Sequence, residues 1–290
     1  MSQPSTYARA TLSALAGDVE YTDRDSALAA REHAVAGSGR LAELTEWLAE
    51  TQRRWPPREL ARARLVVLGD AELGQVAAVA ESSSVGLQVV PVPADPAAAF
   101  HAGVAAADAE VEAGADLLVL AAADVLDARA AAGVLVGLLT GTEPVALLPR
   151  GAEAIDTFEW IARAEHLRDA RRKVAAFRGR PDELLVALGS PTLSAAAGFV
   201  LRAIAGRAPV VLDGTTAVCA ALLCHDVQPR CKGWWRVADT SADPIHTRAL
   251  DELGERPLLD LGTRRGDGTA GVLCVQLLRA ATPLTLETPR

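Results

Sequence analysis

The run RLVVLGD at residues 64–70 is an almost uninterrupted apolar stretch that ends in Gly-Asp. Continuous apolar character is typical of parallel strands that are covered on both faces of a sheet. Six further runs share this character, at residues 87–94, 116–123, 144–149, 183–189, 209–214 and 257–262. We therefore expect these seven runs to be strands of one parallel sheet.

Longer alanine-rich segments with helical periodicity lie between these runs, for example at residues 97–114, 125–139, 152–177, 192–206 and 243–254. An alternation of strands and helices predicts an α/β fold in which helices connect parallel strands. Half of the 290 residues are hydrophobic but only 4% are aromatic, which favours closely packed helices on a sheet. The sequence thus predicts a Rossmann-like parallel sheet flanked by helices.

The first 60 residues have a different pattern. They are helical in character, are interrupted by Gly-Ser-Gly at residues 37–39, and end at Pro56-Pro57. We predict a small helical subdomain over residues 1–60 that is completed by residues 269–290. The parallel α/β core domain then covers residues 61–268.

Charge and composition narrow the classes of partner. The formal net charge is −8 and is dispersed, so we expect no nucleic-acid partner, although a local cationic pocket for one phosphate remains possible. No apolar stretch reaches the roughly 18 uncharged residues of a membrane helix without an interruption by Gly, Pro or a charged residue. The first residues, MSQPSTYARA, lack a basic region followed by an apolar one. We expect no membrane partner, no signal peptide and a cytoplasmic location.

The cysteines raise the question of a metal site. Cys219, Cys224, His225 and Cys231 lie close together in the sequence, but their spacing matches no common zinc pattern. Cys219 and Cys224 also fall within an apolar run, where a cysteine is usually a core residue. We therefore predict no metal site and no cofactor.

Several predicted strands end in residues that can bind a ligand. Asp70 follows the first run, and Asp213-Gly214 ends the run at 209–214. Ligands of open α/β sheets bind at the carboxyl ends of the strands, so these residues predict a shared cleft. Arg150-Gly151 follows the run at 144–149, where the arginine could hold a phosphate or could lie free on the surface.

The stretch RRGDGTAG at residues 264–271 stands where a strand is expected to give way to a helix. Glycines beside a helix start allow backbone N–H groups to approach an anion, and Asp267 could accept a proton from a ligand. The alternative is a plain turn in which Asp267 or Thr269 caps the helix. His246 could also be a general base, although a lone histidine is often structural.

Longer segments of the chain resemble a known family. In chain order they are GSGRLAELTEWLAETQ, GADLLVL with LLTG, AAAGFVLRAIAGRAPVVLDGTTAVCAALL, and SADPIHTRALDELGERPLLDLGTRRGDGTAGVLCVQLLRAA. They resemble segments of nicotinate-nucleotide:dimethylbenzimidazole phosphoribosyltransferases. The resemblance covers most of residues 37–281 and is strongest from about residue 183.

The resemblance implies a Rossmann-like sheet with a small helical domain, and a dimeric enzyme. That enzyme transfers phosphoribose from nicotinate mononucleotide to an aromatic base, dimethylbenzimidazole, to make the lower ligand of cobalamin. Asp267 stands where the family has its catalytic glutamate, and is one methylene shorter. The substrate-binding residues that we predict from the pattern and the resemblance together are Asp70, Arg150, Gly151, Asp213, Gly214, Arg264, Arg265, Gly266, Gly268 and Thr269.

The chain also departs from the family. The family's glycine-rich nucleotide loop aligns with AAADVLDARA at residues 121–130, which keeps none of its glycines. The loss removes close backbone approach to a phosphate. The region after the first strand is also much shorter than in the family.

Three hypotheses follow. The chain is a divergent phosphoribosyltransferase, with Asp267 as the base and with Arg150, Arg264 or Arg265 near the phosphate. It could instead be a non-catalytic paralogue that is the partner subunit of an intact homologue. It could also be a small-molecule binding protein. In each case we expect a homodimer or a heteromer with a homologue.

Overall fold

The computed structural model describes residues 11–69, 73–122, 126–149, 156–263 and 265–285. Five parallel strands form one sheet in the order β2-β1-β3-β4-β5. The strands are β1 (Ala63–Leu68), β2 (Gly86–Val90), β3 (Leu117–Ala122), β4 (Val210–Asp213) and β5 (Trp235–Val237). Strand order reverses direction between β1 and β3, which is the switch point where open α/β sheets place their ligands.

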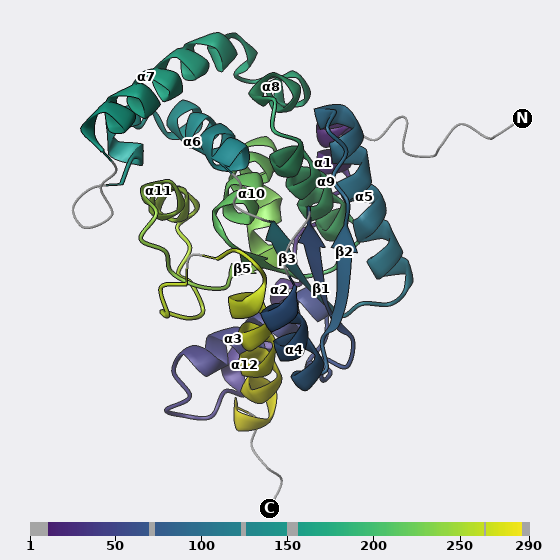
Figure 1. Cartoon of the computed structure of the whole chain (residues 1–290). Helices are drawn as coiled ribbons and strands as arrows, with labels where there is room; N and C mark the ends of the chain where they lie inside the picture. The colour runs from purple at the N-terminus through teal and green to yellow at the C-terminus, as the bar shows by residue number, and fades with distance from the viewer. Residues whose placement is uncertain (1–10, 70–72, 123–125, 150–155, 264, 286–290) are drawn as a thin grey trace, which may run out of the picture.

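Helices cover both faces of the sheet (Figure 1). One apolar cluster joins the sheet to α5 (Pro96–Glu112), α9 (Pro191–Ala205) and α10 (Thr215–Val227). A second cluster joins the opposite face to α3 (Arg40–Gln52), α4 (Gly74–Ser82) and α12 (Thr269–Thr285). The predicted Rossmann-like parallel sheet flanked by helices is therefore confirmed.

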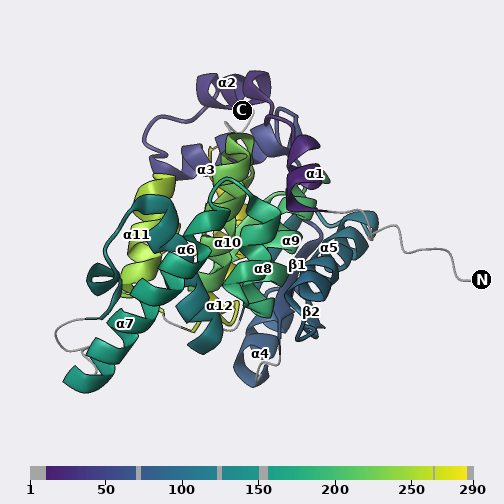
Figure 2. The ribbon, with the colours of Figure 1, turned by 90° about the horizontal axis from the view of Figure 1, so that it is seen from above.

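A further group of helices lies outside α9 and α10. It consists of α6 (Leu126–Thr140), α7 (Thr157–Val174), α8 (Pro181–Leu188) and α11 (Pro244–Leu253). Figure 2 shows α6, α7 and α11 together on one side of the molecule, away from β2 and α4. Short 3₁₀ turns at Pro144–Leu147, Ala175–Phe177 and Pro229–Trp234 complete the described elements.

Three of the seven predicted strands are wrong. Residues 144–149 begin with a 3₁₀ turn, and residues 183–189 lie in helix α8, which Pro181 begins. Residues 257–262 form only an isolated bridge, between Leu259 and Asp239. The fifth strand of the sheet, β5, was not predicted, whereas all five predicted helices are present as α5, α6, α7, α9 and α11.

The amino-terminal helices attach to different faces of the sheet. Helix α3 shares the second apolar cluster with α12, β1 and β3. Helix α1 (Leu12–Gly17) instead belongs to the first cluster, and its Leu12 N–H donates to Asp182 of α8 at 2.6 Å. Helix α2 (Arg24–Glu32) packs beside α3. The division into subdomains at residue 60 stays a prediction.

Within the described ranges, no helix has both the length and the hydrophobicity that a membrane span requires.

Candidate functional site

A polar cavity of about 310 Å³ opens beyond the carboxyl ends of β4 and β5. Its walls come from the end of β4 and the start of α10, the segment after β5, the loop before α12, the residue Pro149, and helices α6, α7 and α11. The described residues that line it are Arg129, Pro149, Arg163, Asp213, Gly214, Thr215, Asp239, Thr240, Ser241, Ala242, Asp243, Pro244, His246, Thr263 and Gly266.

The end of β4 brings a carboxylate and a helix start to this cavity. Asp213 is 3% exposed, and its Oδ2 accepts the N–H of Gly271 at 2.8 Å. Gly214 has a φ of 90°, a conformation that favours glycine, and it begins α10. The start of α10, with the positive end of the helix dipole, therefore lies at the cavity wall.

The segment after β5 adds Asp239, which the sequence analysis did not single out. Its Oδ1 accepts the N–H of Leu261, and its Oδ2 accepts both the N–H and the hydroxyl of Thr263. Burial alone would raise the pKa of the Asp239 carboxyl, but the hydrogen bonds from Thr263 and Leu261 outweigh burial and hold that pKa below its usual value. Asp239 is therefore an ionised residue that fixes one wall of the cavity.

Asp243 forms hydrogen bonds with three helices at the cavity: α6, α10 and α11. Its carboxylate accepts two hydrogen bonds from the Arg129 guanidinium of α6, at 2.8 and 2.9 Å. The hydroxyl of Thr215, at the start of α10, donates to the same carboxylate at 3.3 Å. Asp243 also caps α11 by accepting the N–H of Ile245. This bidentate pair holds the Arg129 guanidinium in one orientation.

The loop before α12 contributes Gly266 to the cavity wall, but Asp267 lies beside the cavity and does not line it. The Asp267 side chain is 17% exposed and forms an ion pair with Arg265 at 2.8 Å. It also accepts the N–H of Thr269 at 3.0 Å, at the start of α12. Asp267 is thus a carboxylate next to a cavity-lining residue, and it also binds the first N–H of α12.

The glycines of this loop have a packing role. A Cβ atom on Gly268, whose φ is +96°, would lie 2.6 Å from Leu65 of β1. A Cβ atom on Gly271 would lie 2.3 Å from Val119 of β3. The start of α12 therefore lies directly against β1 and β3, at the switch point of the sheet.

The structure brings three of the predicted site residues together at the cavity: Asp213, Gly214 and Gly266. Arg265 and Asp267 flank Gly266 in the chain, Gly268 and Thr269 follow, and none of these four lines the cavity. Arg265 donates to Gln75 of α4 at 2.7 Å. Asp70, Arg150, Gly151 and Arg264 lie outside the described residues. His246 is 2% exposed and also lines the cavity, from α11.

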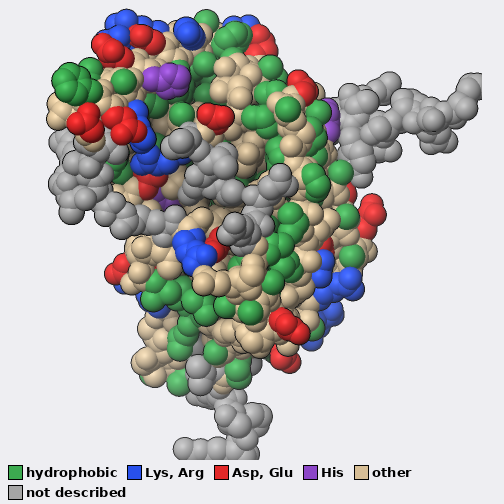
Figure 3. Space-filling view, in the orientation of Figure 1, with side chains coloured by type: hydrophobic (Ala, Val, Ile, Leu, Met, Phe, Trp, Pro, Cys, Tyr) green, Lys and Arg blue, Asp and Glu red, His purple; other side chains and the backbone are tan. Residues whose placement is uncertain are grey.

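Charges of both signs are interspersed on the face shown in Figure 3, so the described part of this face has no extended basic patch. The four cysteines are buried core residues, and burial raises the pKa of the Cys231 thiol to about 12. Cys224 donates its S–H to the carbonyl of Ala197 in α9.

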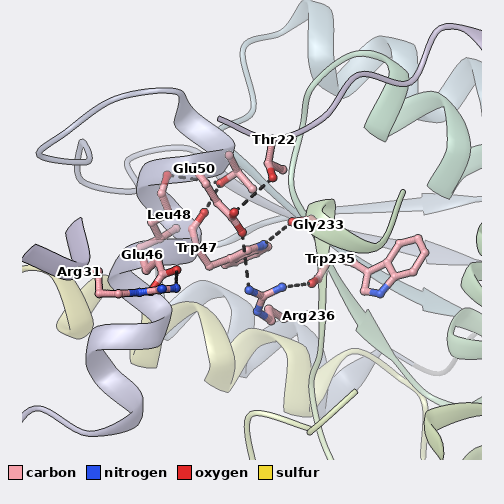
Figure 4. Close-up of polar contacts among 10 residues, drawn as sticks. Thr22, Arg31, Glu46, Trp47, Leu48, Glu50, Gly233, Trp235 and Arg236 are labelled. Atoms are coloured by element: carbon pink, nitrogen blue, oxygen red, sulfur yellow. Dashed lines mark hydrogen bonds and ion pairs between the residues drawn. The ribbon is translucent and has the colours of Figure 1, made fainter. Parts of the chain in front are cut away.

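A second polar cluster joins the amino-terminal helices to β5 (Figure 4). Arg236 of β5 lies over the ring of Trp47, 4.9 Å from its centroid, and 3.8 Å from the Glu50 carboxylate. The indole N–H of Trp47 donates to the carbonyl of Gly233 at 2.9 Å. None of these residues belongs to the described wall of the polar cavity.

Comparisons with known proteins agree with the resemblance. A family model described as a phosphoribosyltransferase matches residues 93–289. The nicotinate-nucleotide–dimethylbenzimidazole phosphoribosyltransferase of Streptomyces avermitilis is 32% identical, over 87% of this chain and 82% of its own length. The enzyme of the same name from Mycobacterium tuberculosis is 33% identical, over 84% of this chain and 82% of its own length.

A solved structure extends the agreement to the fold. The crystal structure of the nicotinate-nucleotide–dimethylbenzimidazole phosphoribosyltransferase from Thermus thermophilus matches with a TM-score of 0.74. It covers 90% of this chain and 96% of its own, at 25% identity.

Proposed function

Because the chain belongs to the nicotinate-nucleotide–dimethylbenzimidazole phosphoribosyltransferase family, we propose that it transfers phosphoribose from nicotinate mononucleotide to an aromatic base. The observation that carries the proposal is the polar cavity at the carboxyl ends of the strands, where Asp213, Gly214 and Gly266 meet. The reaction belongs to the synthesis of the cobalamin lower ligand, as the resemblance implies.

In this reaction a ring nitrogen of the acceptor base attacks C1′ of the ribose. The glycosidic bond to nicotinate breaks, and its electron pair stays on the pyridine nitrogen of the departing nicotinate. The acceptor then loses the proton of its ring N–H, which a neighbouring carboxylate can take. Asp267 is the proposed base because it adjoins the cavity and occupies the position of the family's glutamate.

The phosphate of the donor is proposed to lie at the start of α10. Gly214 leaves room for close approach there, and the first N–H groups of the helix are suited to an anion. Arg150 and Arg264 remain proposed phosphate contacts. Arg265 is a weaker candidate for that role, because its guanidinium is bound to Asp267 and Gln75.

One observation favours a second candidate function, ligand binding without catalysis. The Asp267 carboxylate is already bound by Arg265 and by the N–H of Thr269. The enzymatic role requires that the acceptor base replace Arg265 as the neighbour of this carboxylate. A binding protein, or a partner subunit of an intact homologue, has no such requirement.

The test is to incubate the purified chain with nicotinate mononucleotide and a panel of aromatic bases, and to measure release of nicotinate. We expect Asp267→Asn to lower kcat by about 100-fold or more, because general base catalysis contributes about that factor. Asp267→Glu, which restores the longer carboxylate of the family, should keep activity. Asp251→Asn, at an exposed position on α11, is the matched control.

Wild-type kcat in Asp267→Asn would show that another group takes the proton. If no base supports nicotinate release by the chain alone, and the chain adds nothing to the rate of an intact homologue, transfer from this donor is refuted.

Assembly and location are proposed as well. We propose a homodimer or a heteromer with a homologue, located in the cytoplasm. Light scattering of the chain alone and in a mixture with the homologue measures the first, and cell fractionation measures the second.

A further inference from the structure

The chain around Asp267 is anchored at two points, one on each side. Thr263 lies four residues before Asp267, and Gly271 lies four residues after it. Thr263 donates to the carboxylate of Asp239, two residues beyond β5. Gly271 donates to the carboxylate of Asp213, the last residue of β4. Because β4 and β5 pair as neighbours in the sheet, both carboxylates stand at the same edge of it.

Asp239 fixes the segment that enters the loop. Its Oδ1 accepts the N–H of Leu261 at 2.7 Å, and its Oδ2 accepts the N–H and the hydroxyl of Thr263 at 2.7 and 2.6 Å. Asp239 is 6% exposed. Hydrogen bonds to an ionised acceptor are roughly twice as strong as those between neutral groups. A buried carboxylate that accepts three of them therefore holds Leu261 and Thr263 close to the end of β5.

Asp213 fixes the segment that leaves the loop, at the start of α12. Its Oδ2 accepts the N–H of Gly271, in the first turn of this helix, at 2.8 Å. The first N–H groups of a helix have no partner within it and lie at the positive end of its dipole, so a carboxylate is a favourable partner. Three residues later, Cys274 donates its S–H to the carbonyl of Ala238, the residue before Asp239. The start of α12 is therefore held at the ends of β4 and β5.

Asp267 lies between these two anchors, and its carboxylate has contacts of unequal strength. Its Oδ1 accepts the N–H of Thr269, the first residue of α12, at 3.0 Å. Its Oδ2 pairs with Arg265, whose side chain is 57% exposed, and an exposed ion pair fixes geometry only weakly. The N–H of Thr269 is thus the firmer contact, and it depends on how the loop meets α12. A shift of the segment before the loop would draw the Asp267 carboxylate away from this N–H.

We propose that Asp239 is a positioning residue for Asp267: by holding the segment before the loop, it keeps the Asp267 carboxylate where it takes the proton of the acceptor base. The inference rests on the proposed function for the role of Asp267. A misplacement of about 1 Å can cost about 100-fold in rate. An aspartate has one methylene fewer than a glutamate, so its side chain has less freedom to correct a shift of its backbone. Asp239 acts through Asp267 and exchanges no proton with the substrate.

The first test needs no substrate. It measures amide hydrogen exchange at the N–H of Thr269 by NMR, on the full chain at pH 7. Asp239→Asn should accelerate this exchange about 10-fold, because the loop can then move away from α12. The N–H of Ala98 is the reference, since it binds the Asp95 carboxylate at 2.8 Å at the start of α5. Amides at helix starts exchange by local opening, so Ala98 should exchange as in the wild type.

Further variants separate the contact with Asp239 from a general loss of stability. Thr263→Val removes the hydroxyl bond and keeps the shape of the side chain, and should accelerate exchange at Thr269 about 3-fold. Thr263→Ser keeps the hydroxyl and should keep the wild-type exchange rate. Asp260→Asn, which removes an exposed carboxylate from the same segment, is the matched control for the change of charge. If Asp239→Asn does not fold, Thr263→Val decides in its place.

The second test uses the transfer reaction. Asp239→Asn should lower kcat about 10-fold or more and leave the KM for nicotinate mononucleotide unchanged, because a displaced base slows the chemical step without weakening donor binding. A raised KM with the wild-type kcat would mean that Asp239 contacts the donor, and would overturn the proposal. Exchange at Thr269 that stays at the wild-type rate in Asp239→Asn, or that rises equally at Ala98, would overturn it as well.

The result is separable from the proposed function. Faster exchange at Thr269 alone, in an Asp239→Asn chain whose wild type transfers nothing, supports the hold of Asp239 on the Asp267 carboxylate and refutes the transfer. Transfer with the same kcat in Asp239→Asn and in the wild type does the reverse.

Discussion

At the scale of single residues, Asp239 shows how one carboxylate shapes the cavity. It stands two residues beyond β5, and its two oxygens accept three hydrogen bonds from Leu261 and Thr263. The N–H groups of Leu261 and Thr263 therefore bind Asp239, and they are not available for pairing as a sixth strand beside β5. The segment at 257–262 therefore stops after one bridge and turns toward the loop that contains Gly266 and Asp267.

Asp239→Asn should destabilise the fold by about 1–3 kcal/mol at neutral pH, because the asparagine NH₂ group would face a backbone donor. The folded-state pKa of Asp239 is depressed, so its contribution is present above the ordinary aspartate pKa of about 3.9 and is lost as the pH falls through the folded-state value. Urea unfolding from pH 7 to pH 3 should show the difference between variant and wild type shrinking toward acid.

Asp260→Asn is the control, since Asp260 is exposed and accepts one hydrogen bond, from Thr240. A difference between Asp239→Asn and wild type that stays constant with pH would contradict the assigned ionisation.

The sequence predicted part of this site for a physical reason. Asp213, Gly214 and Gly266 are adjacent to strand ends or helix starts, and such positions can be read from local pattern. The local pattern could not identify three other residues of the cavity wall, Arg129, Asp239 and Asp243. Arg129 meets Asp243 across 114 residues of chain, and Asp239 follows a strand of only three residues, β5. Because β5 was not predicted, the local sequence pattern did not mark Asp239, which follows it, as a residue at a strand end.

At the scale of elements, the contact between α5 and α9 depends on two glycines. A Cβ atom on Gly103 of α5 would lie 1.9 Å from the carbonyl oxygen of Ala195. A Cβ atom on Gly198 of α9 would lie 2.3 Å from the carbonyl oxygen of Phe100. At each glycine the backbone of the opposite helix therefore lies where a side chain would be. Backbone atoms cannot move aside as a flexible side chain could.

Gly103→Ala should destabilise the protein by about 3 kcal/mol, at the upper end of the usual cost of overpacking, because α5 and α9 must separate. Gly74→Ala is the matched control. It lies at the start of α4 with no atom within 4 Å of the added Cβ, and should be neutral or slightly stabilising. Guanidinium unfolding measures both. An equal effect of the two substitutions would mean that helix propensity, rather than close approach, governs Gly103.

The long helices were predictable because their periodicity extends over many residues, whereas short apolar runs were ambiguous. The run at 183–189 contains Leu184, Leu185 and Leu188, which share one helical face, and Pro181 fixes the helix start. The run at 144–149 is too short to show either period. Length alone does not separate the correct strand predictions from the wrong ones, because the run at 209–214 is as short as the run at 144–149 and forms β4.

At the scale of the whole molecule, Arg236 connects the amino-terminal helices to the edge of the sheet. It donates to the carbonyl of Trp235 at 2.7 Å and lies over Trp47 of α3, as Figure 4 shows. Four glutamates lie near enough to attract it, and the two with the largest effect are Glu255, which follows α11, and Glu50 of α3. Burial raises the pKa of both carboxyl groups, and the attraction to Arg236 opposes that rise.

Arg236→Met should therefore destabilise the protein by about 3 kcal/mol at pH 7, at the lower end for a broken buried ion pair, because it removes a cation from two partly buried carboxylates. The raised folded-state pKa values mean that Glu50 and Glu255 favour folding while protonated, and that this contribution is lost as the pH rises through them. Removing Arg236 raises both pKa values further. The loss in Arg236→Met should consequently shrink as the pH falls and the carboxylates take up protons. Thermal unfolding from pH 8 to pH 4 measures this trend.

Arg53→Met, which breaks an exposed pair with Glu20, should cost no more than about 1 kcal/mol. A loss in Arg236→Met that grows toward acid would show that Arg236 stabilises the fold through packing on Trp47 rather than through the two carboxylates.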